Sequence, residues 1–349
     1  MTFQNILVIK LRYIGDVLLA TPTLHALKAA HPGARLTVIV NHGTEEILAG
    51  NPDVDEVLPL KKTSILAQSR FVSGLRRRRF DAVIDLTDGD RSAFLTWASG
   101  APLRIGFNDE QRWRGRCYTT VVRGDAEGHR IERDLKALIP LGVAAKDPIP
   151  RLRLSAEDEM RADQLLDRLE VRKDQAIVMI QPGARYWFKA WPAERFAELA
   201  DRLIAAQHCQ IIIGGSHEEA DLAQRVAGFA KSRLIVMAGQ ASLRQFAAVV
   251  KRAQLFVGND NGAMHIAAAM GTPVIGLFGP SNPGEWGPRG GRVKVLYKGL
   301  DCRACFHPTC ERGEFNCMRQ ISVDEVTKAA EDVLQKAVPA SVRLSQVKT

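Results

Sequence analysis

The sequence predicts two doubly wound α/β domains, each built on a parallel sheet that helices cover on both faces. Short apolar runs alternate with amphipathic segments along almost the whole chain, which is typical of successive βαβ units. Some of these runs, such as Ile211-Ile212-Ile213, are continuously apolar, as strands buried on both faces are. The chain of 349 residues is too long for one ordinary core and suits two domains.

The first half of the chain predicts an N-terminal domain over residues 1–150. We expect its strands at residues 6–11, 36–40, 54–58, 82–86 and 104–107. We expect helices between them, for example at residues 16–31, 65–79 and 92–99.

The second half repeats the alternation after a junction rich in proline and charge. Pro148 and Pro150 punctuate the chain, and a highly charged helical stretch over residues 155–169 follows. We therefore predict a linker helix within residues 151–175, a second domain over residues 176–321, and a C-terminal helix and loose tail over residues 322–349. The expected strands are residues 177–181, 210–214, 234–238, 255–258 and 274–278, and the expected helices are residues 194–206, 218–230, 243–252, 263–270 and 323–337.

The charge balance of the chain favours anionic partners. The formal net charge is +9, which suits nucleic acid, acidic lipid or a phosphorylated substrate, although an ordinary basic surface is equally compatible. There is no helix-turn-helix or RNP motif and few aromatic residues lie among the basic ones, so we expect no nucleic-acid partner.

The composition is that of a soluble globular protein, with 46% hydrophobic and 25% charged residues. No stretch reaches the ~18–20 uninterrupted apolar residues that a membrane span requires. Lys10, Arg12 and Asp16 break up the apolar start, and no small-residue cleavage site follows. We therefore expect a first strand rather than a signal peptide, and a cytoplasmic protein.

The first candidate site follows the first expected strand. Gly15 permits a tight turn there, and Asp16 falls at or near the start of the next helix. One interpretation is a helix cap, for which Asp is preferred. The other is a carboxylate at the carboxyl end of the strand, where it can take a proton from an acceptor hydroxyl. The loop lacks the G-x-G-x-x-G pattern, which argues against dinucleotide binding.

The second candidate site is a polar, Gly-rich turn between a strand and a helix that begins near Gly262. Exposed backbone N–H groups at such a helix start form a phosphate cradle. Asp260 or Asn261 can hydrogen-bond sugar hydroxyls, and His265 lies where it can face a ligand. The alternative is a capped helix with a core-facing histidine.

The third candidate site is an aromatic loop after the first strand of the second domain. It carries Arg185 and Lys189. A cation in this loop can neutralise the charge that develops on a diphosphate leaving group, which removes the need for a metal ion. The alternative is a loop anchored by its aromatic rings with solvated cations.

The fourth candidate site is Gly214-Gly215-Ser216-His217-Glu218, again after a strand. The glycines allow a ligand to approach the backbone, and Glu218 can accept hydrogen bonds from ribose hydroxyls. The alternative is an acidic residue in a first helical turn, favoured by the helix dipole.

A cysteine-rich segment near the C-terminus is a candidate metal site. Four thiols within sixteen residues can bind zinc or an iron–sulfur cluster, and a reducing compartment disfavours disulfides. A stabilising loop, or partial disulfide pairing in an oxidised sample, is the alternative, since the spacing lacks the paired regularity of a zinc ribbon. The candidate ligands are Cys302, Cys305, Cys310 and Cys317.

Together these motifs resemble the family 9 glycosyltransferases, the ADP-heptose:lipopolysaccharide heptosyltransferases, over nearly the whole chain. The segments that carry the resemblance are residues 9–22, residues 181–184 with 189–192, and residues 259–265 with 276–281. Among subfamilies, residues 92–107 are most similar to heptosyltransferase III, which adds a branching heptose to the second core heptose. The resemblance implies the GT-B fold, two Rossmann-like domains facing a central cleft, with the acceptor on the first domain and the donor on the second.

The resemblance also implies residue roles in an inverting transfer that requires no metal or other cofactor. Asp16, with Gly15 beside it, matches the general base, and Lys189 matches the cation near the donor phosphates. Glu218 matches the ribose contact, and Ala241 and Leu243 fall where adenine is held. The donor-sugar and diphosphate loop corresponds to Asp260, Asn261, Gly262 and His265, with Arg185 a further candidate.

The expected partners are an ADP-heptose donor and a lipid A-linked core oligosaccharide at the cytoplasmic face of the inner membrane. Candidate membrane contacts are the run Arg76–Arg79 and Arg112, Arg114 and Arg116. A rival interpretation is a nucleotide-sugar epimerase of the same architecture, which acts on the donor alone and needs no acceptor.

Overall fold

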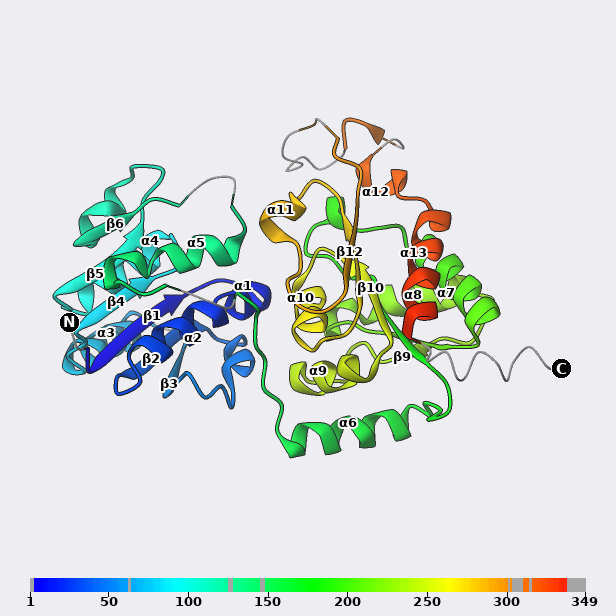
Figure 1. Ribbon diagram of the computed structural model, residues 1–349, viewed down its shortest axis with the longest axis horizontal. Helices are drawn as coiled ribbons and strands as arrows, with labels where there is room; N and C mark the ends of the chain where they lie inside the picture. The colour runs from blue at the N-terminus through cyan, green and yellow to red at the C-terminus, as the bar shows by residue number, and fades with distance from the viewer. Residues whose placement is uncertain are drawn as a thin grey trace. The chain divides into compact units, whose positions relative to one another are not determined.

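The structure is a computed structural model that describes residues 3–61, 64–124, 128–144, 148–300, 302, 310–313 and 316–337. The chain divides into two compact units, Met1–Arg153 and Leu154–Thr349. Each unit contains an all-parallel six-stranded sheet with helices on both faces (Figure 1), so the predicted doubly wound α/β class is confirmed. In the described residues, no helix is both long and apolar enough to cross a bilayer.

The sheet of the first unit has the strand order β3-β2-β1-β4-β5-β6. Helices α3 and α4 cover one face, where Leu75 and Leu95 pack against Leu7, Ile9 and Val83, and α1, α2 and α5 cover the other (Figure 1). The strands are β1 (Asn5–Lys10), β2 (Arg35–Asn41), β3 (Glu56–Leu60), β4 (Ala82–Asp85), β5 (Leu103–Phe107) and β6 (Thr120–Val122). The helices are α1 (Ile14–Leu19), α2 (Thr21–Ala30), α3 (Ile65–Arg77), α4 (Asp90–Ala98) and α5 (Arg130–Lys136), with short 3₁₀ turns η1 (Glu45–Leu48), η2 (Trp113–Cys117) and η3 (Ile139–Leu141).

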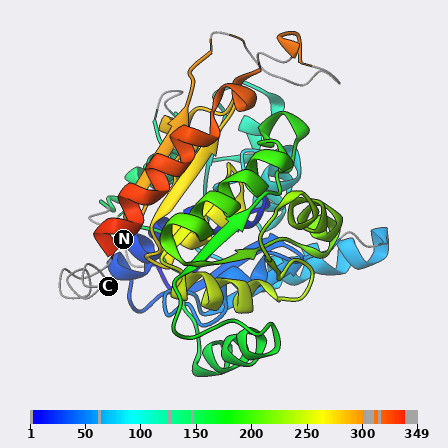
Figure 2. The ribbon, with the colours of Figure 1, turned by 90° about the vertical axis from the view of Figure 1, so that its right-hand side faces the viewer.

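The sheet of the second unit has the order β12-β11-β10-β7-β8-β9. Figure 2 shows α13 and α7 lying side by side across one face, together with α8, and α9 and α10 cover the other face. The strands are β7 (Ile177–Gln181), β8 (Gln210–Ile213), β9 (Ile235–Val236), β10 (Leu255–Asn259), β11 (Val274–Phe278) and β12 (Val293–Tyr297). The helices are α6 (Ala156–Arg168), α7 (Ala193–Gln207), α8 (Ala220–Phe229), α9 (Leu243–Arg252), α10 (Gly262–Ala269), α11 (Pro283–Trp286), α12 (Cys317–Gln320) and α13 (Val323–Ala337), with 3₁₀ turns η4 (Trp187–Lys189) and η5 (His217–Glu219).

The predicted helix over residues 16–31 is in fact two helices. Helix α1 ends at Ala20, which also begins α2, and Pro22 lies in the first turn of α2. Proline lacks the N–H that a continuous helix would use there, so the chain restarts rather than continues.

Both sheets have a switch point, where neighbouring strands lead into helices on opposite faces. In the first unit the neighbours are β1 and β4, and in the second they are β7 and β10. Ligands of open α/β sheets bind beyond the carboxyl ends of the strands at such points. We therefore expect functional residues in the segments that follow these four strands.

Candidate functional site

Asp16 lies at the switch point of the first unit. It is the third residue of α1, it is half-buried, and its Oδ2 accepts a hydrogen bond of 3.4 Å from the backbone N–H of Tyr13, the N-cap. Asp16 therefore helps to cap the helix and still reaches the carboxyl edge of the sheet. Gly15 lies buried inside the first turn of α1, so the tight turn predicted there is wrong; extended Tyr13 makes the entry instead.

The loop that carries Asp16 is held by the neighbouring strands. The N–H of Leu11 donates to Thr87 Oγ1 at 2.7 Å, and the Arg12 guanidinium donates to the carbonyl of Thr87 at 3.0 Å. Asn41, the last residue of β2, donates to the carbonyl of Arg12 at 3.1 Å. These bonds hold the backbone segment that leads into α1 and Asp16.

A buried ion pair lies beneath this loop and was not predicted. Lys10 Nζ is 2.5 Å from Asp134 Oδ2 and donates to the carbonyl of Leu86, and both charged side chains are at most 1% exposed. Burial lowers the pKa of Lys10, while the charges of Asp134 and Asp16 oppose that shift. The signal in the sequence is a lysine at the end of an apolar strand, which suggests a buried ion pair. The partner could not be named, because Asp134 lies 124 residues away in the sequence.

A second charge network surrounds the ends of β4 and β5. The Arg133 guanidinium lies 3.9 Å from the centre of the Phe107 ring and binds Asp88 at 2.5 Å, and Arg114 binds the same carboxylate at 2.9 Å. Arg114 is 4% exposed, and Arg112 pairs with Glu110 at 2.6 Å. The prediction that Arg114 contacts a membrane is therefore wrong, because the folded chain buries and neutralises it.

The switch point of the second unit brings together residues from two of the predicted sites. Lys189 Nζ, in η4, lies 2.6 Å from Oδ2 of Asp260, which follows β10. Asp260 is 8% exposed and Lys189 is 23% exposed, so the lysine lies on the accessible side of the pair. An ammonium group has three donors, and it can hold Asp260 and an incoming anion together.

Helix α10 begins beside this pair. Asn261 is its N-cap: Oδ1 accepts from the N–H of Met264 at 3.1 Å, and Nδ2 donates to the carbonyl of Gly183 at 2.7 Å. The N–H groups of Gly262 and Ala263 lie ahead of the helix's own hydrogen-bond ladder and point out of its positive end. His265, in the first turn of α10, is buried and 5% exposed.

A glutamate that the sequence did not single out lies at the end of β7. Glu218 is exposed, whereas Glu219 accepts from Gln181 Nε2 at 3.1 Å and from the N–H of Ser216 at 2.8 Å. A Cβ at Gly183 would collide with the Glu219 carboxylate, so the glycine makes room for it. The Ser216-x-x-Glu219 capping-box spacing was the signal available in the sequence.

The remaining predicted residues lie at the edge of this region or beyond it. Ala241 and Leu243 are half-buried and flank Ser242, the N-cap of α9, where the chain leaves β9. Arg185 is exposed, with its guanidinium 5.3 Å from the Tyr186 ring.

The cysteine-rich segment is described only in part. Cys302 and Cys310 are half-buried thiols and Cys317 is buried at the start of α12, while Cys305 lies outside the described residues. Where the chain is described, no group of three or more His, Cys, Asp or Glu side chains is placed to hold a metal ion.

Comparisons with known proteins show which proteins the chain is similar to. The model of glycosyltransferase family 9 (heptosyltransferase) matches residues 68–315. Lipopolysaccharide heptosyltransferase 3 of Escherichia coli is 30% identical over 291 residues, which is 80% of this chain and 84% of that protein.

Two solved structures are similar over almost the whole chain. A family 9 glycosyl transferase from Veillonella parvula DSM 2008 is 25% identical with a TM-score of 0.84, covering 96% of this chain and 98% of that one. The E. coli heptosyltransferase WaaC with ADP is 23% identical with a TM-score of 0.72, covering 95% and 100%. These likenesses confirm GT-B as the fold class.

Proposed function

Because the chain belongs to glycosyltransferase family 9, the heptosyltransferases, we propose that it transfers a heptose from ADP-L-glycero-D-manno-heptose to the inner core of lipopolysaccharide and releases ADP. The proposed product is the branching third heptose on the second core heptose. Its support is the 30% identity to an E. coli protein named lipopolysaccharide heptosyltransferase 3. The proposal places the reaction at the cytoplasmic face of the inner membrane, where the lipid A-linked acceptor is expected.

The observation that carries the proposal is the Lys189–Asp260 pair beside the start of α10. A diphosphate leaving group gains negative charge as its bond to the sugar breaks. Lys189 and the N–H groups of Gly262 and Ala263 are fixed before that charge develops, and such preorganised donors stabilise a transition state more than solvent does. The proposed role of Asp260, held by Lys189, is to accept hydrogen bonds from donor-sugar hydroxyls.

In the first unit, Asp16 is the proposed general base. Its carboxylate takes the proton of an acceptor hydroxyl, and that oxygen forms a bond to the anomeric carbon of the donor. The bond from this carbon to the diphosphate breaks, and ADP leaves with the electron pair. A single displacement of this kind inverts the anomeric carbon.

For the donor nucleoside, the geometry favours Glu219 over Glu218 as the ribose contact. Glu219 lies at the end of β7 within the site, whereas Glu218 points to solvent. Ala241 and Leu243, beside the start of α9, are the proposed contacts of adenine.

Lys189 supplies the positive charge that other transferases draw from a divalent ion, so we expect transfer to continue in EDTA. A rate that falls in EDTA and returns with one divalent metal would show that the lysine is not sufficient.

The test of the proposed function is ADP release with defined acceptors, followed by linkage analysis of the product. We expect release with a core that carries two heptoses and none when the branching heptose is already present. Activity only on a core without heptose would assign an earlier transfer step. An isomerised nucleotide sugar formed without acceptor would favour the epimerase instead.

A further inference from the structure

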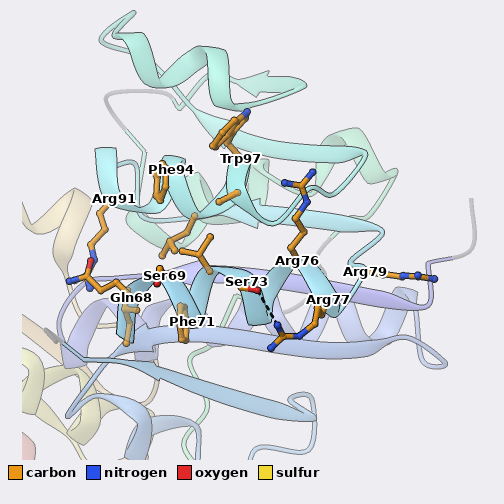
Figure 3. A pocket seen from close by; sticks show the side chains of 14 residues that line it. Gln68, Ser69, Phe71, Ser73, Arg76, Arg77, Arg79, Arg91, Phe94 and Trp97 are labelled. Carbon is orange, nitrogen blue, oxygen red and sulfur yellow. Dashed lines mark hydrogen bonds between the residues drawn. The ribbon is translucent and has the colours of Figure 1, made fainter. Parts of the chain in front are cut away.

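An open cavity of about 800 Å³ lies between α3 and α4 of the first unit, away from the loops described above. Figure 3 shows that two kinds of side chain dominate its rim. Four are arginines and three are aromatic residues, namely Arg76, Arg77, Arg79, Arg91, Phe71, Phe94 and Trp97.

The arginines of this cavity keep their charge uncompensated. In the run Arg76–Arg79, Arg78 does not line the cavity, and it forms a two-bond ion pair with Glu56 at 2.5 and 2.7 Å. No described carboxylate pairs with Arg76, Arg77, Arg79 or Arg91, and no acidic residue lines the cavity. The surface therefore carries a concentrated positive charge that solvent alone screens.

Two of the aromatic residues, Phe94 and Trp97, lie on the solvent side of α4. Phe94 is 46% exposed and Trp97 is 56% exposed, and their ring centres are 6.0 Å apart. They are spaced three residues apart, as Arg91 and Phe94 are, so all three lie on one helix face. Exposed aromatic rings beside basic side chains are typical of surfaces that lie in a membrane interface.

We propose that this α3–α4 surface docks the protein on an anionic phospholipid bilayer. The arginines meet the headgroup phosphates, and Phe94 and Trp97 enter the boundary with the acyl chains. The net charge of +9 and the absence of carboxylates in the lining give the charge complementarity. A symmetric contact with a second copy would instead place these unpaired arginines against each other. The inference rests on the proposed function for the membrane as the place of reaction, and it deepens that function by naming the surface that meets the lipid.

The test is co-sedimentation of the full chain with phosphatidylglycerol-containing vesicles, compared with pure phosphatidylcholine vesicles. We expect binding to the anionic vesicles only, and loss of binding in high salt. The triple variant R76Q/R77Q/R79Q should lower the partition coefficient about fivefold for each arginine, or about 100-fold in all. A matched variant, R168Q/R172Q/R225Q, removes the same charge from exposed positions of the second unit and should change it about twofold or less.

The depth to which Trp97 enters the bilayer is measured by quenching of tryptophan fluorescence with brominated lipids. We expect quenching in the wild type that largely disappears in W97F, while W187F, at another exposed tryptophan, retains it. Transfer to a short soluble acceptor should be unchanged in the triple variant, which keeps this test separate from that of the proposed function. Equal binding by the two triple variants, unquenched Trp97, or a dimer in sedimentation equilibrium that W97F abolishes would overturn the proposal.

Discussion

Replacing Lys189 with methionine is the most direct test of the site in the second unit. The change removes the ammonium charge and leaves the carboxylate of Asp260 without its partner. The ammonium lies 2.6 Å from a carboxylate that is only 8% exposed. Loss of a preorganised group that stabilises developing charge typically lowers kcat by about 10²–10³. Asp260 then also repels the donor diphosphate, and two unit charges 4 Å apart interact by about 4 kcal/mol at an effective dielectric constant of 20. We therefore expect both kcat and donor affinity to fall.

The double variant K189M/D260N separates these two effects. Neutralising Asp260 removes the repulsion, so donor affinity measured by titration calorimetry should recover in part. The rate of ADP release should stay low, because nothing replaces the lysine in the transition state. K328M, which removes an exposed lysine from α13, is the matched control and should behave as wild type. A K189M enzyme that keeps kcat within about tenfold of wild type would refute the role given to Lys189.

Three further predictions address other parts of the two units. Lys10→Met leaves Asp134 charged and buried, and should lower the free energy of unfolding in urea by about 3–5 kcal/mol. The double variant K10M/D134L should recover most of that loss. Equal losses in the single and double variants would contradict a stabilising role of the pair. Arg244 on α9 binds Asp158 and holds the pKa of that carboxyl well below its usual range. Asp158→Asn should therefore lower the free energy of unfolding by about 1–3 kcal/mol at pH 7. The stabilisation is present above the unfolded pKa of about 3.9, so the difference between variant and wild type should shrink as pH falls below it, and a constant difference would argue against the linkage. Glu219→Gln should raise the KM for the donor about tenfold and Glu218→Gln should not; the reverse order would restore the original assignment.

The alternation of strands and helices could be predicted because hydrophobic periodicity is local. All ten expected strands exist, since buried parallel strands are continuous apolar runs. The two strands that were not predicted, β6 and β12, are edge strands. β6 has only three residues, and Val293 of β12 is exposed, so neither carries a strong apolar signal.

The site was predictable where a motif directly follows a strand. The proposed site residues Asp16, Lys189 and Asp260 each lie in the segment that follows a strand, and the topology of the sheets brings those segments to the switch points. Glu219, the proposed ribose contact, was not expected because η5 precedes α8, and this extra 3₁₀ turn sets which of the two adjacent glutamates contacts the end of β7. The Lys10–Asp134 pair was missed because it is formed only when distant segments pack.

The measurement that bears most directly on the account compares turnover and donor binding in Asp16→Asn. Loss of a general base should lower kcat by about 10²–10⁴. The dissociation constant for the donor should stay at the wild-type value, because the residues assigned to the donor lie in the other unit. If the variant instead turns over normally, or loses its affinity for the donor, Asp16 is not the proton acceptor and the proposed mechanism is wrong.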